Sequence, residues 1–239
     1  MKLGIMQPYF FPHLGHFALI AAVEQWVVFD VTQYTPKSWM NRNRVLHPVN
    51  GWNYISIPLI KSSTSIKSQS ARVKNIQESK QTILGKLSHY KKSAPFYSQV
   101  IELVTKTFER EKTDSLVDLN VSALKEVCQY LNISFKYRIC SELDIPFPNN
   151  ISAGQWAPLI CNHLKATGYV NPLGGKALFD VSEFEQFRID LYFLDFLSYQ
   201  YDTNPYDFES NLSILDVMMW NSPEKIKKVI DAHSLLIRG

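Results

Sequence analysis

Two histidines three residues apart, His13 and His16, are the side chains in this chain best suited to chemistry. They follow a short apolar stretch and a turn of aromatic residues and prolines, and they precede an apolar segment, so we expect them at the N-terminus of a helix. Backbone N–H groups there bind anions, and a histidine adds a hydrogen bond or a proton transfer. We predict catalytic roles for both histidines, with substrate bound by Gln7, Tyr9 and Gly15. The alternative is that the histidines only cap the helix and pack in the turn.

A second polar group follows the next apolar run, Trp26–Asp30. Asp30 ends that predicted strand, where open α/β sheets bind ligands, and it is the third catalytic candidate. An arginine fork suits a phosphate or a carboxylate, and aromatic rings can stack on a sugar or a base. We predict that this group binds substrate through Gln33, Tyr34, Trp39, Asn41, Arg42 and Asn43. The alternative is a polar turn between two strands.

A third candidate is the glycine pair in Pro172–Lys176. Paired glycines allow positive φ angles and a close backbone approach, and a lysine adds charge. We predict substrate contacts from Gly174, Gly175 and Lys176, although the segment lacks Walker A spacing and an ordinary turn is an equal alternative.

Cys161 lies two residues from His163 on a predicted helix, hence on a different face, so we expect a buried, inert thiol. No His, Cys, Asp or Glu set has metal-ligand spacing.

The size and charge pattern narrow the class of protein. The chain has 239 residues, 46% of them hydrophobic, which favours a single α/β domain over residues 1–239 with a helical insertion at about 78–131. Residues 61–92 carry eight basic side chains and one acidic one, and residues 177–216 carry nine acidic side chains and one basic one. The basic block favours a phosphorylated ligand or an acidic partner, or else a solvated helix face. No nucleic-acid-binding motif accompanies it, so we expect no nucleic acid partner.

Targeting signals are not evident. Lys2 is followed by too few apolar residues for a signal peptide, and the longest apolar run is too short to span a membrane. Three widely spaced cysteines form no disulfide framework. We therefore expect a cytoplasmic protein without a membrane span.

Hydrophobic patterns predict the elements that position these residues. The first expected unit is strand–helix–strand, with its two strands parallel. It has a strand at Leu3–Met6, a helix at Gly15–Val23 and a strand at Trp26–Asp30. Further strands are expected at Trp52–Leu59, Ile133–Ile139, Tyr169–Asn171 and Ile189–Phe196. Further helices are expected at about 78–92, 96–111 and 115–131, at Gln155–Ala166 and Asn211–Met219, and after Ser222. In the helix at Asn211–Met219 we expect Ser213 as the cap, with Asp216 at the capping-box position. The alternation predicts an α/β, Rossmann-like parallel sheet.

Two family resemblances emerge from these segments. His13-Leu-Gly-His16 resembles the His-x-Gly-His motif of the nucleotidylyltransferase superfamily, in which both histidines touch a nucleotide triphosphate. That superfamily's late Ser-Ser-Thr-x-Ile-Arg element is similar to Ser62–Lys67, which falls far too early and ends in lysine. Nearly the whole chain resembles the WbqC-like family. The matching segments are Gln7–Pro12, Gly15–Phe17, Asp30–Tyr34, Trp39–Asn43, Tyr90–Phe96, Gly174–Gly175, Phe184, Tyr199–Gln200, Phe208 and Leu212–Asp216.

The WbqC-like resemblance implies a function and adds Tyr199, Gln200 and Asp216 to the substrate-binding candidates. Such proteins are associated with surface-polysaccharide clusters, notably O-antigen synthesis. The resemblance implies modification of a nucleotide-linked amino sugar, by acyl or aminoacyl transfer from a carrier-protein thioester, with the nucleotide sugar and an acidic carrier protein as partners. The alternatives are a nucleotidyltransferase that uses the His-x-Gly-His loop with ATP or another nucleotide and Mg²⁺, or a non-catalytic nucleotide-sugar-binding module. The resemblance implies no other cofactor and no particular oligomeric state.

Overall fold

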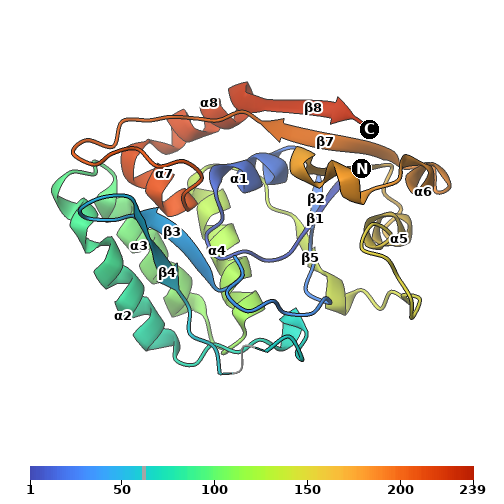
Figure 1. Ribbon diagram of the computed structural model, residues 1–239, viewed down its shortest axis with the longest axis horizontal. Coiled ribbons are helices and arrows are strands. Elements are labelled where there is room, and N and C mark those ends of the chain that lie inside the picture. Colours follow the sequence, from blue (N-terminus) through green and yellow to red (C-terminus); the bar gives the residue numbers. More distant parts are fainter. Residues whose placement is uncertain (61–62) are drawn as a thin grey trace.

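The sheet at the centre of the molecule is mostly parallel. The computed structural model describes residues 1–60 and 63–239, so Lys61 and Ser62 of the expected loop lie outside the described residues. Six strands lie in the order β5-β2-β1-β6-β7-β8, and only the edge strand β8 runs antiparallel to its neighbour (Figure 1). Their bounds are β1 Lys2–Met6, β2 Gln25–Val28, β5 Tyr137–Ile139, β6 Gly168–Pro172, β7 Asp190–Phe196 and β8 Ser234–Arg238. The predicted α/β class with a Rossmann-like parallel sheet is confirmed.

The first strand–helix–strand unit forms as predicted. β1 pairs in parallel with β2, with Gly4 opposite Trp26, and α1 (Leu14–Ala21) makes the crossover between them. β1 also pairs in parallel with β6 on its other side, so the strand order reverses at β1. The carboxyl ends of β1 and β6 therefore open onto the crevice in which doubly wound sheets bind ligands.

Helices cover both faces of the sheet, because successive side chains of each strand point to opposite faces. On one face, Trp26 and Val28 join a hydrophobic core with α1, α4 (Leu116–Tyr130), α7 (Ile214–Trp220) and α8 (Pro223–His233). On the other face, Leu3, Ile5 and Val27 pack with α5 (Trp156–His163) and α6 (Val181–Glu185). Figure 1 shows α5 and α6 on one side of the strands and α4 on the other.

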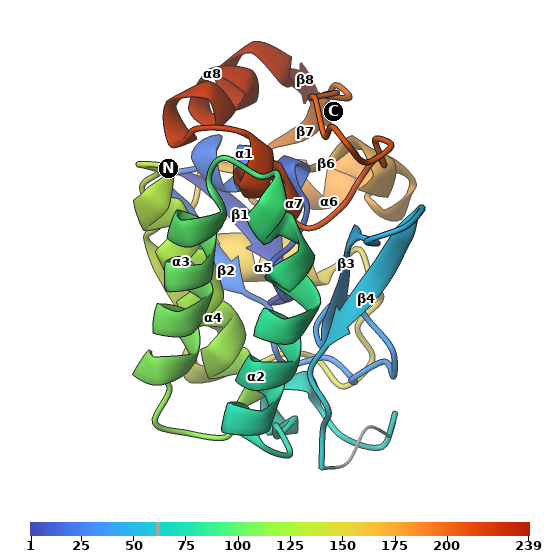
Figure 2. The ribbon, with the colours of Figure 1, turned by 90° about the vertical axis from the view of Figure 1, so that its left-hand side faces the viewer.

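A hairpin and three helices stand beside the main sheet. β3 (Arg42–Leu46) and β4 (Trp52–Ser56) form a separate antiparallel pair, closed by a turn that contains Gly51 at a φ of 69°. α2 (Ile76–Leu87) lies between this hairpin and α3 (Tyr97–Arg110), which packs on α4 (Figure 2). Helices α2, α3 and α4 span residues 76–130, the region of the helical segment expected at about 78–131, and buried side chains of α3 and α4 share the core of α1. The 3-10 turns are η1 Ser68–Ser70, η2 Ser88–Lys92, η3 Cys140–Glu142 and η4 Leu173–Leu178.

Several expected elements need correction. Asn41–Asn43 does not form the polar turn that was the alternative to a binding role, because Arg42 starts β3. The strand expected at Ile133–Ile139 begins only at Tyr137, and β8 was not foreseen. α7 starts at Ile214, where Ser213 caps the helix as expected but accepts from Leu215 rather than from Asp216. The α8 start is as predicted, with Ser222 as the cap and proline at the first helical position.

The β1–α1 loop is buried, and three polar side chains satisfy its carbonyl groups. Asn120 on α4 donates to the carbonyls of Pro8 at 2.7 Å and Met40 at 2.8 Å. Asn43 donates to those of Phe10 at 3.0 Å and Phe11 at 2.8 Å, and the Ser213 hydroxyl also donates to Phe11, at 2.7 Å. Phe11 has a φ of 39°, a strained value for a side chain of its size. The surrounding hydrogen bonds therefore hold the loop in a conformation that it would not keep alone.

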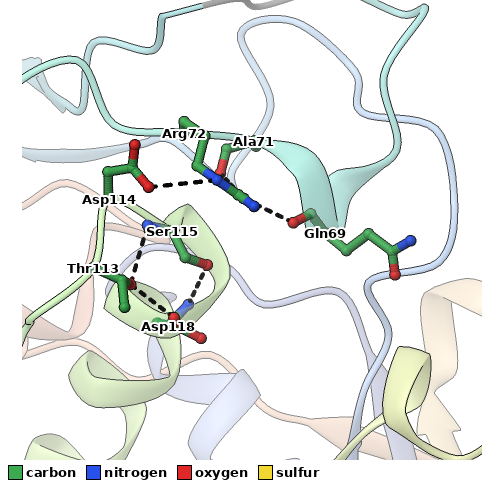
Figure 3. A network of polar contacts seen from close by, with 7 residues as sticks. All are labelled: Gln69, Ala71, Arg72, Thr113, Asp114, Ser115 and Asp118. Atoms are coloured by element: carbon green, nitrogen blue, oxygen red, sulfur yellow. Dashed lines mark hydrogen bonds and ion pairs between the residues drawn. The ribbon is translucent and has the colours of Figure 1, made fainter.

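The start of α4 is itself anchored to the segment that follows the hairpin (Figure 3). Ser115 caps α4 by accepting from the Asp118 N–H at 3.2 Å, and the Thr113 hydroxyl donates to the Asp118 carboxylate at 2.8 Å. Arg72 lies 3.4 Å from the Asp114 carboxylate and donates to the Gln69 carbonyl at 2.9 Å. These contacts fix the helix that carries Asn120 under the β1–α1 loop.

We predict that Asn120→Leu destabilises the protein by about 2–4 kcal/mol, because leucine fills the same space but leaves two buried carbonyls without a donor. Urea unfolding measures the effect. Asn162→Leu, on the exposed surface of α5, is the matched control and should change stability by less than about 0.5 kcal/mol. Equal stability of the two variants would contradict the role of Asn120 as the support of this loop.

Candidate functional site

Three neighbouring cavities meet at His13, the described residue that lines all of them. The first cavity, of about 360 Å³, lies between the start of α1 and the segment after β7. The second, of about 230 Å³, lies over the ends of β1, β6 and β7. The third, of about 310 Å³, opens between the β1–α1 loop and β3. Tyr9 borders the second and third cavities, and Asn211 borders the first and third. Together they offer a divided site of the size of an extended small molecule.

The second cavity occupies the crevice expected from the topology. Its lining includes Met6 at the end of β1, Pro172 at the end of β6 and Asp195 near the end of β7. The strand order reverses between β1 and β6, and the loops after these strands diverge there. Asp195 is the one charged side chain among its described lining residues. The sheet therefore opens a site here that carries no cation of its own.

His13 is the N-cap of α1, and this fixes the chemistry of its ring. Its Nδ1 atom accepts from the Gly15 backbone N–H at 3.2 Å, so the proton of the neutral ring is on Nε2. Although the ring reaches solvent, the surrounding protein desolvates it, and this effect, together with the charge of Arg44, lowers its pKa. His13 is thus a neutral hydrogen-bond donor at neutral pH, and its one lone pair is already engaged.

Gly15 allows the His13 ring to fold back over the helix. A Cβ atom at position 15 would lie 3.0 Å from Cε1 and 3.2 Å from Nδ1 of His13. It would also lie 3.4 Å from the Phe196 ring. Any larger residue would push the imidazole away from the N-cap position. This explains the glycine in the His-x-Gly-His sequence in terms of packing.

His16 lies beneath His13 and is only 4% exposed. Its ring packs edge-on against Trp26, with centroids 5.0 Å apart, and it borders the second cavity. Burial, and secondarily the neighbouring His13, lower its pKa to about 3. No described residue bonds its Nε2 atom. His16 is therefore a neutral ring at physiological pH, with an unused polar atom next to a cavity.

An arginine between two tryptophans borders the third cavity. The Arg44 guanidinium lies 5.5 Å from the Trp39 ring centroid and 5.0 Å from that of Trp52, and it donates to the Asn211 carbonyl at 3.2 Å. Trp39 and Trp52 are 41% and 38% exposed. Such a planar cation suits an anionic oxygen, and the exposed indole faces suit a ring of a ligand.

The structure brings together half of the predicted site. His13, Gly15 and His16 line the cavities together with Tyr9, Trp39, Asn43, Gly174, Tyr199 and Gln200. Asn43 has its amide committed to the β1–α1 loop, as described above. The residues that remain outside all three cavities are Gln7, Asp30, Gln33, Tyr34, Asn41, Arg42, Gly175, Lys176 and Asp216.

The outlying residues of the first two segments have structural partners. Both carboxylate oxygens of Asp30 accept from Ser141, from its N–H at 3.0 Å and its hydroxyl at 2.7 Å. Gln7 donates to the Thr32 hydroxyl at 3.1 Å, and Gln33 pairs with the Lys67 backbone. The fully buried Tyr34 donates to Asn41 at 2.9 Å. Arg42 stacks on Tyr54 at 4.2 Å.

The glycine pair does not use the positive φ angles that glycine allows. Gly174 and Gly175 lie in η4 without positive φ angles. A Cβ atom on Gly175 would come within 2.2 Å of the Asn171 side chain, so close packing requires this glycine. Lys176 lies over the Phe193 ring at 5.8 Å.

Cys161 is fully buried and burial raises its pKa, in keeping with an inert thiol.

Asp216 is buried within a network of tyrosines. Its carboxylate accepts from the hydroxyls of Tyr90 and Tyr201, the latter at 2.6 Å, and burial raises its pKa. The Tyr90 hydroxyl in turn accepts from the Leu46 backbone N–H at 2.9 Å. Asp216 thus connects the wall of the first cavity, through Tyr201, to β3.

Sequence reasoning missed Arg44 and Glu209, the arginine and the glutamate that line the cavities. Alternation in Arg42–Leu46 before the Asn50-Gly51 pair indicates a hairpin strand, on which positions 42 and 44 are half-buried on the same face. Glu209 carries no comparable local signal, because its place depends on how the long segment after β7 folds back.

Comparison with known proteins identifies the family. The model of the WbqC-like protein family matches residues 7–228. The chain belongs to the WbqC-like protein family. This WbqC-like protein is also 27% identical over 221 residues to the Mycobacterium tuberculosis protein named "Uncharacterized protein Rv1507c", covering 91% of this chain and 92% of that one. No solved structure matched it.

Two features, a metal-ligand cluster and a membrane-spanning helix, are not found in the part of this WbqC-like protein that the structure describes. Within residues 1–60 and 63–239, no three His, Cys, Asp or Glu side chains converge as metal ligands. In the same part of the chain, no helix combines the length and apolar character needed to cross a membrane.

We predict that His16 makes the WbqC-like protein sensitive to acid. The unfolded chain takes up a proton near pH 6.5, whereas folded His16 stays neutral to about pH 3. Between these values the free energy of unfolding should therefore fall as the pH falls, by about 1.4 kcal/mol per pH unit from this group. His16→Phe should remove that slope in urea unfolding, and the exposed-site control His163→Gln should keep it. The same slope in His16→Phe and the wild type would contradict the prediction.

Proposed function

We propose that this WbqC-like protein modifies a nucleotide-linked amino sugar in surface-polysaccharide biosynthesis, such as that of O-antigen, by acyl or aminoacyl transfer from a carrier-protein thioester. The observation that carries the proposal is the meeting of three cavities at His13. The third cavity is bordered by Arg44 and Trp39. The first cavity is bordered by aromatic rings and the Glu209 carboxylate. A nucleotide sugar has the corresponding parts: an anionic diphosphate, a planar base and a polar sugar ring. His13, between them, would face the reacting group.

Arg44 and Trp39 suit the nucleotide end. The guanidinium has donors beyond the one bonded to Asn211, and a diphosphate accepts them in charge-assisted pairs. The 41% exposed Trp39 ring offers a surface on which a base or a sugar can stack. The third cavity would therefore take the nucleotide part of the substrate.

His13 suits the reacting end as a donor to developing negative charge. When a sugar amine attacks a thioester carbonyl, a C–N bond forms and the carbonyl oxygen becomes an oxyanion. The C–S bond then breaks, and the carrier thiol leaves with the proton that the amine gives up. The Nε2–H of a neutral His13 can donate to the oxyanion, and such a donor contributes about 10²–10³ in rate. Its engaged Nδ1 atom makes His13 a poor general base.

The basic block remains a candidate docking surface for an acidic carrier protein. Arg72 and Lys80 are paired with Asp114 and Glu109. Lys91 and Lys92 are exposed on η2, and the block keeps a positive balance. Electrostatic steering by such a surface would speed up association with an anionic partner.

A nucleotidyltransferase is the second candidate, favoured by one observation. His13, Gly15 and His16 all border the second cavity at the carboxyl end of β1, as a His-x-Gly-His triphosphate site requires. The charge of the second cavity disfavours a triphosphate, because the charged side chain among its described lining residues is the carboxylate of Asp195. A triphosphate would need Mg²⁺ to offset that carboxylate. Release of pyrophosphate from ATP or UTP, lost in His16→Phe, would favour this candidate over acyl transfer.

We predict that His13→Asn lowers the transfer rate about 10²–10³-fold, because asparagine can still cap α1 but cannot reach the reacting oxygen. The measurement is transfer of acyl groups from a loaded carrier protein to a nucleotide-linked amino sugar. The melting temperature should stay close to that of the wild type. An unchanged rate would remove His13 from the mechanism, and an absence of transfer with retained nucleotide-sugar binding would favour a binding module.

We predict that Arg44→Gln weakens the binding of a nucleotide sugar about 10- to 100-fold, the loss expected for a charge-assisted hydrogen bond. Calorimetric titration with a panel of UDP-, dTDP- and GDP-linked sugars measures it. Arg42→Gln is the matched control, since it removes the same charge two residues away on the same strand, outside the cavities. Equal losses in both variants would assign the effect to general charge.

A further inference from the structure

We infer that the first cavity is a binding site for a primary ammonium group, which the Glu209 carboxylate and the rings of Tyr199, Tyr201 and Phe208 would hold. The cavity itself is independent of the proposed function. Its role in holding the amino group of a substrate rests on that function. It would place the ammonium group in a different cavity from Arg44, with His13 in the lining of both.

Aromatic rings form one wall of this cavity. The Tyr199 and Tyr201 rings lie 5.4 Å apart, and Phe208 meets Tyr201 edge-on at 5.1 Å. The Tyr199 hydroxyl donates to Asn221 at 2.8 Å and that of Tyr201 to Asp216 at 2.6 Å. Since buried acceptors occupy both hydroxyls, the rings meet a ligand mainly through their carbon faces, which attract cations and repel anions.

Glu209 supplies the negative charge of the first cavity. Its side chain is half-buried and borders the cavity. Its Oε1 atom lies 3.8 Å from the position that a Cβ atom would take on Gly51, so the carboxylate stands between the cavity and the β3–β4 turn. Among the described residues, no lysine or arginine forms an ion pair with it. A ligand cation would satisfy this carboxylate.

The surroundings keep the cavity electronegative. The segment that forms its wall also carries Asp202 and Asp207, and Asp216 lies beneath Tyr201. Arg44 lines the third cavity and not the first, and it bonds the carbonyl of Asn211, which lines both. The acidic and the basic side chain thus border different cavities that share His13, and a molecule with an amine and a phosphate would bind in one orientation.

Small neutral and cationic probes test the site without a nucleotide. Crystals soaked with benzylamine should show its nitrogen within hydrogen-bonding distance of Glu209, and crystals soaked with benzyl alcohol should show an empty cavity. In solution, benzylamine should bind at least about 10-fold tighter than benzyl alcohol, the value of one ion pair in such a site. Equal binding of both probes, or benzylamine density elsewhere only, would overturn the inference.

Two matched pairs of ligands distinguish which substrate carries the ammonium group. UDP-glucosamine against UDP-glucose tests the sugar, and alanyl-pantetheine against propionyl-pantetheine tests an aminoacyl donor. Preference for the amine in the first pair assigns the site to the acceptor, and preference in the second assigns it to the donor. Equal affinities within both pairs, despite binding, would overturn the inference and leave the proposed function standing.

We predict that Glu209→Gln abolishes the preference for amines over their neutral counterparts, for benzylamine over benzyl alcohol as for UDP-glucosamine over UDP-glucose. The amide keeps the shape of the side chain but cannot pair with a cation. Glu185→Gln, an exposed position on α6, is the control and should keep the preference. If neither nucleotide sugar binds, the proposed function fails, and the benzylamine preference of the wild type and its loss in Glu209→Gln still decide the inference.

Discussion

The interior of the molecule must satisfy the carbonyl groups of a strained loop, and the site depends on this constraint. The loop between β1 and α1 passes through the core with Phe11 at a φ of 39°. Buried carbonyls without donors are costly, so α4, β3 and the residue that caps α7 each contribute one side chain: Asn120, Asn43 and Ser213. His13 follows directly, and its orientation is thereby set by three distant segments. A donor held in this way loses little freedom when it meets a ligand.

The charges of the site are separated rather than mixed. Arg44 borders the third cavity between two tryptophans, Glu209 borders the first cavity with tyrosines, and the neutral His13 lines both. Among the described residues, the two charged side chains form no ion pair with each other. This arrangement favours one orientation of a molecule that carries both signs of charge.

Local patterns predicted the parts of the fold that short-range physics determines. The first strand–helix–strand unit follows from an apolar strand, a loop and an apolar helix, and the start of α8 follows from Ser222 and the proline after it. The position of Asn41–Asn43 could not be predicted in the same way, because polar side chains beside a tryptophan suggest a binding loop as strongly as a strand. Asn43 is polar because a loop 30 residues earlier in the chain needs donors. Glu209 reaches its cavity only through long-range packing, which no local pattern encodes.

The buried carboxyl of Asp216 connects elements that would otherwise move separately. Through Tyr201 it is bonded to the wall of the first cavity, and through Tyr90 to the Leu46 backbone on the strand that carries Arg44. Loops that recognise two ends of a ligand usually adjust independently, and a ligand of the wrong length is then tolerated. Here one interior group connects the wall of the first cavity and the strand that carries Arg44 to a common frame, so the spacing between the two is fixed from within the core.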